Sequence, residues 1–163
     1  MAESELNVRV AEEKDVPLIL EFIQDLAKYE KLRHEVVATE ELLRKNLFGE
    51  RKMAEVVLGY YQDQPAAFAL FFHNFSTFLG KPGIYLEDLY VREEFRSMGF
   101  GTQMLSHIAR LAKERDCGRL EWWVLDWNES AINFYKKIGA ESMSDWTVFR
   151  VTGEALDKLA DKS

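Results

Sequence analysis

Apolar and polar residues follow two periods along the chain, and these periods divide it into strands and helices. Leu6, Val8 and Val10 alternate with polar neighbours, which predicts a strand. Between Val16 and Ala27 the apolar residues recur instead at the spacing of one helix face. By the same criteria strands are predicted over 6–10, 53–61, 66–75, 84–91, 119–125 and 146–151, and helices over 16–28, 39–47, 102–112 and 131–138 and after Thr152. This order predicts an α/β (α+β) protein, a mixed sheet with helices on both faces.

The composition narrows the class of protein. A chain of 163 residues, 47% of them apolar, can bury a substantial core, so a single domain over 1–163 is predicted. The net charge of −7 argues against a binder of nucleic-acid phosphates and suits a cationic substrate. Cys117 is the only cysteine, and no apolar run is long enough to span a bilayer. These features favour the reducing cytoplasm, with no nucleic acid and no membrane as partner.

The stretch 87–101, E-D-L-Y-V-R-E-E-F-R-S-M-G-F-G, joins a predicted strand to a predicted helix. The first N–H groups of a helix have no partner within it, and the helix dipole adds partial positive charge there. Gly99 and Gly101 lack a Cβ, so an anion can approach the main chain closely. The stretch therefore predicts a phosphate-binding loop. Glycines at these places also suit an ordinary tight turn.

Four motifs carry a family resemblance. R-x-x-G-x-G at 96–101 resembles the acetyl-CoA pyrophosphate loop of the GNAT acetyltransferases, although Ser97 stands where better-known members carry glycine. L-A-K-Y-E at 26–30, Y-L-E-D at 85–88 and W-N-E-S-A-I-N-F-Y-K-K-I-G-A at 127–140 are similar to the diamine (spermidine/spermine) and thialysine acetyltransferases. The resemblance implies a GNAT-like three-layer fold with a largely antiparallel sheet, acetyl-CoA as cosubstrate, and a homodimer.

The resemblance also implies which residues hold the coenzyme. The strand end would contribute Leu89, Tyr90 and Val91. The loop and the helix start would contribute Arg96, Ser97, Met98, Gly99, Phe100, Gly101 and Thr102. A second segment, placed near the pantetheine arm or at a helix cap, would contribute Asn128, Glu129, Ser130 and Ala131.

Acetyl transfer to an amine requires a base, because a lysine-like amine has a pKa near 10.4 and must lose a proton before it attacks. Glu87 is the best candidate, since an acid within an apolar strand is unusual and should face a cavity. Strand alternation would point Asp88 to the opposite face, so the two carboxyls should not share one role. Alternatively, both carboxyls only bond to neighbouring loops.

The tetrahedral intermediate and the departing thiolate need hydrogen-bond donors. A strand N–H near Leu89 to Val91 could donate to the oxygen of the intermediate, where a splayed strand leaves donors free. Tyr135 could protonate the thiolate, and its place in N-F-Y-K favours this role over that of a core aromatic.

The acceptor is expected to be a small cationic amine. By the resemblance, its binding groove would be bordered by Tyr29, Glu30, Glu87, Glu121, Trp122 and Trp123. Carboxylates attract a cationic chain and aromatic faces add cation–π contact, although core or dimer packing explains the tryptophans equally well. No His/Cys cluster suggests a metal.

Three functions are compatible with the sequence. The leading one is direct transfer of acetyl from acetyl-CoA to a primary amine of a small polyamine, diamine or lysine-like (thialysine) acceptor. A second is acetylation of a protein lysine or an aminoglycoside amine. A third is a non-catalytic CoA-binding module, which would need neither Glu87 nor Tyr135.

Overall fold

The computed structural model describes residues 5–162, and this part of the chain divides into two compact units that meet between Leu125 and Asp126. The first unit contains the whole of one sheet, whose strands lie side by side in the order of the sequence. They are β1 (Asn7–Val10), β2 (Glu55–Tyr61), β3 (Gln64–Ser76), β4 (Lys81–Val91) and β5 (Leu120–Trp122). Neighbouring strands are antiparallel except β4 and β5, which are parallel. The prediction of a mixed, largely antiparallel sheet is confirmed.

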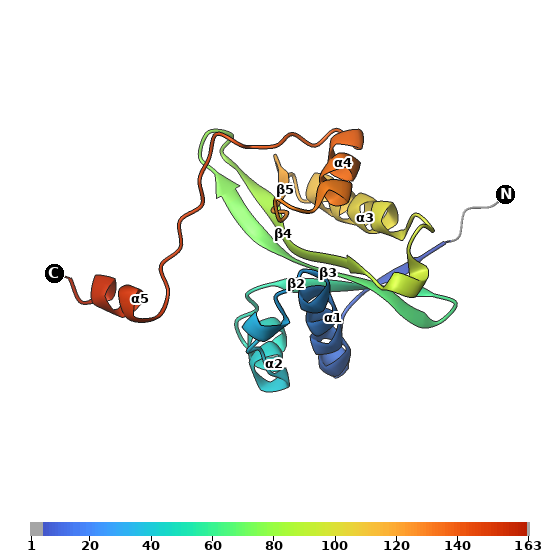
Figure 1. Cartoon of the computed structure of the whole chain (residues 1–163), viewed down its shortest axis with the longest axis horizontal. Helices are drawn as coiled ribbons and strands as arrows, with labels where there is room; N and C mark the ends of the chain where they lie inside the picture. Colours follow the sequence, from blue (N-terminus) through green and yellow to red (C-terminus); the bar gives the residue numbers. More distant parts are fainter. Residues whose placement is uncertain (1–4, 163) are drawn as a thin grey trace. The chain divides into compact units, whose positions relative to one another are not determined.

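Helices cover both faces of this sheet, also as predicted (Figure 1). On one face lie α1 (Val16–Tyr29) and α2 (Glu40–Phe48), and on the other lies α3 (Phe100–Glu114). The core below α1 and α2 joins helix and strand side chains, among them Ile19, Phe22, Leu26, Leu47, Val56, Leu58 and Phe68. Burial of one apolar stripe from each helix is what fixes the sheet between two helical layers. No helix of the described residues is both long and apolar enough to cross a membrane.

The connection between β1 and α1 is held by the carboxylate of Asp15. Asp15 is buried, and Arg9 donates to its two oxygens from Nη1 at 2.8 Å and from Nη2 at 2.9 Å. The backbone N–H of Glu12 also donates to Asp15 Oδ2 at 2.7 Å. These bonds to Arg9 and Glu12 hold the pKa of the Asp15 carboxyl below its usual value.

The two hairpins of the sheet differ from the prediction in length. Gln62 and Asp63 alone connect β2 to β3, with φ of 49° and 64°, the left-handed pair of a two-residue hairpin turn. The next loop is shorter than the predicted 76–83, because β3 runs to Ser76 and β4 starts at Lys81. Conversely, β5 spans three residues instead of 119–125, since only Leu120 to Trp122 pair with β4.

The second unit contains two helices, α4 (Glu129–Lys137) and α5 (Gly153–Ala160). Both helices were predicted. The prediction of a strand over 146–151 is wrong, since that segment forms no strand in the described chain. Its large apolar side chains are exposed, Trp146 at 75% and Phe149 at 90%. Apolar alternation can predict a strand, but a strand also needs a neighbour that completes its hydrogen bonds.

Candidate active site

A β-bulge in β4 sets the geometry of the candidate base. Phe71 of β3 pairs with Leu86 and Leu70 pairs with Asp88, so Glu87 is an extra residue on β4. A bulge places two residues of one strand opposite one residue of the other and interrupts the alternation of faces. Asp88 therefore lies on the same side of the sheet as Leu70. The expectation that Asp88 points away from Glu87 is wrong, because the alternation it relied on is broken between them.

Three carboxyls meet beside this bulge. Burial, followed by the charges of Glu87 and Glu30, raises the pKa of Asp88 to about 7. Burial and then the charge of Glu87 also raise the pKa of Glu30. Glu87 itself is exposed. The site thus combines one water-facing carboxylate with a neighbour that takes up a proton near neutral pH.

Tyr85 extends the acidic region toward β5. Burial, then the charges of Glu87, Asp88 and Glu121, raise the pKa of its phenol. The register places Tyr85 beside Glu121, whose Oε1 accepts from Asn74 Nδ2 at 3.2 Å. We call Glu30, Glu87, Asp88 and Glu121 the acidic cluster.

Aromatic rings lie against the acidic cluster. The ring of Tyr85 meets that of Phe72 at 5.1 Å and that of Trp123 edge-on at 5.6 Å, centroid to centroid. Trp123 is 59% exposed, so its indole is accessible to a ligand. Trp122 pairs with Leu86 and is half-buried, one position along the strand from Glu121.

The end of α1 brings Tyr29 and Glu30 to the same region. The N–H of Leu32 donates to the carbonyl of Ala27 at 2.7 Å, and the N–H of Lys31 donates to that of Lys28 at 3.1 Å. Lys31 has φ of 63°, so the helix ends in a Schellman motif with a lysine at the left-handed position. This termination fixes Glu30, the C-cap residue, beside β4.

The loop predicted to bind phosphate has the expected local form. Ser97 and Gly99 have φ of 65° and 82°, and α3 begins at Phe100 with Gly99 as its N-cap. A Cβ built on Gly99 or Gly101 would meet no atom within 4 Å, so the space outside the backbone is open. Orphan N–H groups at the start of a 15-residue helix then face open space, which fits the pyrophosphate of a coenzyme.

One edge of β4 is open beside the acidic cluster. β5 accompanies β4 only from Ile84 to Leu86, so no strand of the described chain lies along that edge between Glu87 and Val91. Alternate N–H and C=O groups of this stretch point outward. Leu89, Tyr90 and Val91, which were predicted to bind the coenzyme, are half-buried there.

The guanidinium of Arg96 folds back over two aromatic rings of the first unit, although the residue itself is exposed. Its Cζ is 4.8 Å from the ring centroid of Tyr29 and 5.4 Å from that of Tyr90. Its Nε donates to the carbonyl of Val91 at 3.1 Å.

The remaining predicted residues belong to the second unit. Asn128 is the N-cap of α4, and its Oδ1 accepts from the N–H of Ala131 at 3.4 Å. Glu129 and Ser130 are exposed in the first turn. Tyr135 is half-buried on the same helix, with its ring 5.7 Å from that of Phe134. The local prediction of a capped helix carrying Tyr135 is confirmed.

Sequence reasoning missed Asp88 and Tyr85 as members of the site. No periodicity could have found Asp88, because the bulge that turns it is not visible as a break in the apolar pattern. The Y-L-E-D motif contains both residues, and this was the available signal.

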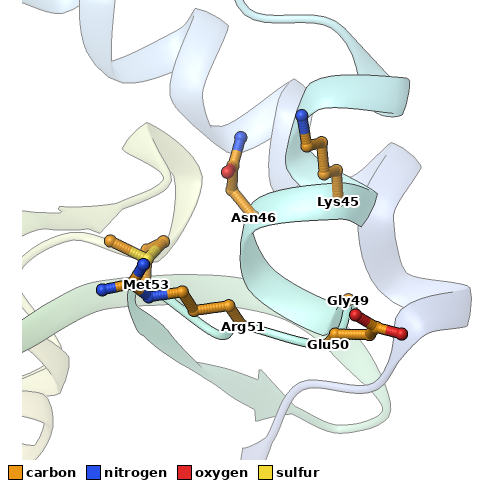
Figure 2. A pocket seen from close by; sticks show the side chains of 6 residues that line it. All are labelled: Lys45, Asn46, Gly49, Glu50, Arg51 and Met53. Carbon is orange, nitrogen blue, oxygen red and sulfur yellow. The ribbon is translucent and has the colours of Figure 1, made fainter.

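A pocket of about 370 Å³ lies apart from the predicted site residues, at the end of α2 (Figure 2). Lys45 and Asn46 come from the last turn of the helix, and Arg51 and Met53 from the segment after it. Within residues 5–162, no three His, Cys, Asp or Glu side chains are grouped so that they could hold a metal ion.

The fold places an open helix start beside an open strand edge, an arrangement that suits an anionic ligand. The chain belongs to the acetyltransferase (GNAT) family, whose sequence profile matches residues 20–140. It is an N-acetyltransferase, which transfers an acetyl group to an amine, and the family uses acetyl-CoA.

Individual relatives are similar over almost the whole chain. L-ornithine N5-acetyltransferase of Arabidopsis thaliana is 32% identical over 198 aligned residues, covering 94% of this chain and 87% of that protein. Thialysine N-epsilon-acetyltransferase of Bos taurus is 36% identical over 166 residues, covering 95% and 97%. Among solved structures, an integron cassette protein from the mobile metagenome of V. cholerae matches with a TM-score of 0.80 and 27% identity, covering 96% of this chain and 98% of that one.

Proposed function

We propose that the protein transfers acetyl directly from acetyl-CoA to a primary amine of a small polyamine, diamine or lysine-like acceptor. The observation that carries this proposal is the acidic cluster beside the open edge of β4. Four carboxyls around Tyr85 and Trp123 are a site for a flexible cation, because charges attract the ammonium groups and rings face the methylenes. The relatives' names, which specify thialysine and ornithine, point to the same class of acceptor.

Acetyl-CoA would supply a thioester-bound acetyl group, held by its pyrophosphate on the backbone of Arg96 to Thr102. The open space outside Gly99 and Gly101 supports this placement. The strand end, Leu89 to Val91, would lie along the pantetheine arm and offer an N–H to the reacting carbonyl oxygen. On the second unit, Asn128 to Ala131 would bind the same arm from the first turn of α4.

Glu87 would take the proton of the bound ammonium, directly or through water. It is exposed and lies beside Asp88, whose pKa of about 7 would let it relay that proton near neutral pH. Tyr29, Glu30, Glu121, Trp122 and Trp123 would border the acceptor. Tyr135 would give a proton to the departing sulfur.

We also propose that the protein is a homodimer of the reducing cytoplasm. Exposed apolar side chains on the second unit support association, and a single half-buried cysteine, Cys117, is compatible with a reducing compartment.

The decisive experiment is thiol release from acetyl-CoA with a panel of spermidine, putrescine, thialysine, lysine, an aminoglycoside and lysine peptides. We expect the small cationic amines to give the highest kcat/KM. Glu87→Gln should lower kcat strongly and recover part of it at high pH, where more amine is neutral. Tyr135→Phe should lower kcat by about 10²-fold with little change in melting temperature.

Preference for a neutral or anionic acceptor over every cationic one would refute the assignment of the acceptor. Acetyl-CoA binding without thiol release on any amine would favour the non-catalytic module.

A further inference from the structure

Arg96 occupies a position between the two halves of the proposed active site. It begins the loop whose backbone would hold the coenzyme, since Ser97 and Gly99 follow at once in left-handed conformations. Its guanidinium, however, lies over Tyr29, the last residue of α1, and over Tyr90 of β4. One side chain of the loop therefore contacts two elements of the first unit, α1 and β4.

The Arg96 guanidinium makes both ring contacts and a hydrogen bond. Two ring faces lie within 5.4 Å of its Cζ, and its Nε is bonded to the carbonyl of Val91. A planar guanidinium stacks on aromatic rings in a way that a lysine ammonium does not. The carbonyl end of α1 adds negative potential at this point and favours a cation.

The contact with Tyr29 bears on the acceptor side because Glu30 is the next residue. Glu30 is the C-cap of α1, and its carboxyl lies close enough to the acidic side of β4 that the charge of Glu87 raises the pKa of Glu30 and the charge of Glu30 raises the pKa of Asp88. A change in how Tyr29 is held therefore changes where a carboxylate of the acidic cluster lies.

We infer that Arg96 is a positioning residue: by stacking on Tyr29 and Tyr90, its guanidinium ties the coenzyme loop to the end of α1 and thereby orders the acceptor site. The main chain of the loop, and not this guanidinium, binds the coenzyme phosphates. This inference rests on the proposed function, since it assigns the two sides of the site to coenzyme and amine.

A second consequence follows from linkage. If the loop and the end of α1 are joined through Arg96, ordering of the loop by coenzyme favours the end of α1 that binds the amine. Coupling of this kind is reciprocal between two ligands. The presence of CoA should tighten amine binding in the wild type and should do so less when the guanidinium is removed.

The test compares Arg96→Lys and Arg96→Gln with the wild type. The Kd of acetyl-CoA is measured by calorimetry, and kcat and KM for spermidine are measured by thiol release. Both variants should raise the KM for the amine about fivefold, the scale of losing an exposed cation–π pair, and should change the Kd of acetyl-CoA less than twofold. Arg96→Lys should fail to rescue, because it keeps the charge and loses the planar stack.

Tyr29 completes the test. Tyr29→Phe keeps the ring, so Arg96→Lys should raise the KM for the amine as much in this background as in the wild type. Tyr29→Leu should raise the KM for the amine by itself. In the Tyr29→Leu background, Arg96→Lys should then add less than it does in the wild type. Additive effects of the two substitutions would contradict a shared contact.

Arg92 provides the matched control. It is a neighbouring arginine whose Cζ lies 4.7 Å from the ring centroid of Phe22 and which also pairs with Glu21 of α1. Arg92→Lys should lower the melting temperature without raising the KM for the amine. An equal rise in KM would mean that any loosening of α1 suffices, and the inference would fail.

Two further outcomes separate the inference from the proposed function. If Arg96→Gln weakens acetyl-CoA tenfold or more, Arg96→Lys restores it, and the amine KM stays constant, Arg96 is a phosphate ligand and the inference is wrong while the function stands. If the wild type binds no acetyl-CoA, the proposed function fails and the inference fails with it.

Discussion

Asp88 carries a carboxyl that the fold makes harder to ionise. Its pKa of about 7 lies above the 3.8 of an ordinary aspartate because burial and two neighbouring carboxyls, Glu87 and Glu30, oppose its negative charge. A raised folded-state pKa means that this group's contribution to stability is present below about pH 4 and is lost as the pH rises through about 7.

Replacing Asp88 with asparagine should therefore stabilise the protein at high pH. We expect Asp88→Asn to gain on the order of 1–3 kcal/mol in the free energy of unfolding at pH 8, with the difference closing toward pH 4. Urea unfolding across this pH range measures it, and Glu87→Gln, which removes a neighbouring charge and leaves Asp88 buried, should give a smaller gain in the same direction. A variant less stable than the wild type at pH 8 would show that ionised Asp88 is stabilised by a partner.

Ser97 and Gly99 both have a left-handed backbone conformation, which is strained for serine and unstrained for glycine. A non-glycine residue in the left-handed region is strained, and glycine is not. Ser97→Gly should raise the free energy of unfolding by up to about 1 kcal/mol, and Gly99→Ala should lower it by about the same amount. The space around Gly99 is open, so a methyl group adds strain and no clash. Thermal melts of both variants in the absence of ligand give the comparison, and opposite signs are the expected result.

At the scale of elements, β1 and α1 are joined by the Arg9–Asp15 pair. The pKa of Asp15 is depressed, so the stability it provides is present above about pH 4 and is lost as the pH falls through the lower folded value. This dependence is opposite to that of Asp88.

Asp15→Asn should lower the free energy of unfolding by about 2–3 kcal/mol at pH 7, because it leaves Arg9 without its bidentate partner. The loss should shrink as the pH falls below about 4, because the carboxyl of the unfolded chain then takes up a proton and the wild type loses the stability that the pair provides. Denaturant unfolding at pH 7 and pH 3 tests both statements. An unchanged stability at pH 7 would mean that Tyr60, which accepts from Arg9 Nη2 at 2.8 Å, holds the arginine well enough alone.

Elements were predictable where their own residues determine them. The apolar stripe of α1, the glycine before α3 and the asparagine before α4 carry their signals locally, and each element formed where expected. The bulge at Glu87 and the lack of a strand over 146–151 depend instead on whether and how a neighbouring strand pairs with these residues. A bulge is a property of two paired strands, and a strand without a neighbour does not form.

The candidate site was predictable in its parts and not in its arrangement. Its residues were found through motifs, but strand alternation separated Asp88 from Glu87. This error arises because the bulge depends on pairing with β3. The direction of the Arg96 side chain likewise depends on the end of α1, which lies far away in sequence.

For the whole molecule, the single domain over 1–163 and the homodimer remain predictions. Sedimentation at micromolar concentration should give twice the chain mass of 19.0 kDa, that is 2 × 19.0 = 38.0 kDa. We expect the species to persist on tenfold dilution, since obligate homodimer interfaces are large and rich in apolar side chains. A 19.0 kDa species alone would contradict the dimer.

The acidic cluster lies on a chain with a net charge of −7, and this affects how fast an acceptor arrives. Long-range attraction raises the encounter rate of a polycation, and salt shortens its reach to about 10 Å at 0.1 M and about 3 Å at 1 M. We therefore expect kcat/KM for spermidine to fall steeply with added NaCl, while kcat barely changes. For an amine with a single positive charge the same titration should give a shallower slope, so ionic strength would itself select among acceptors.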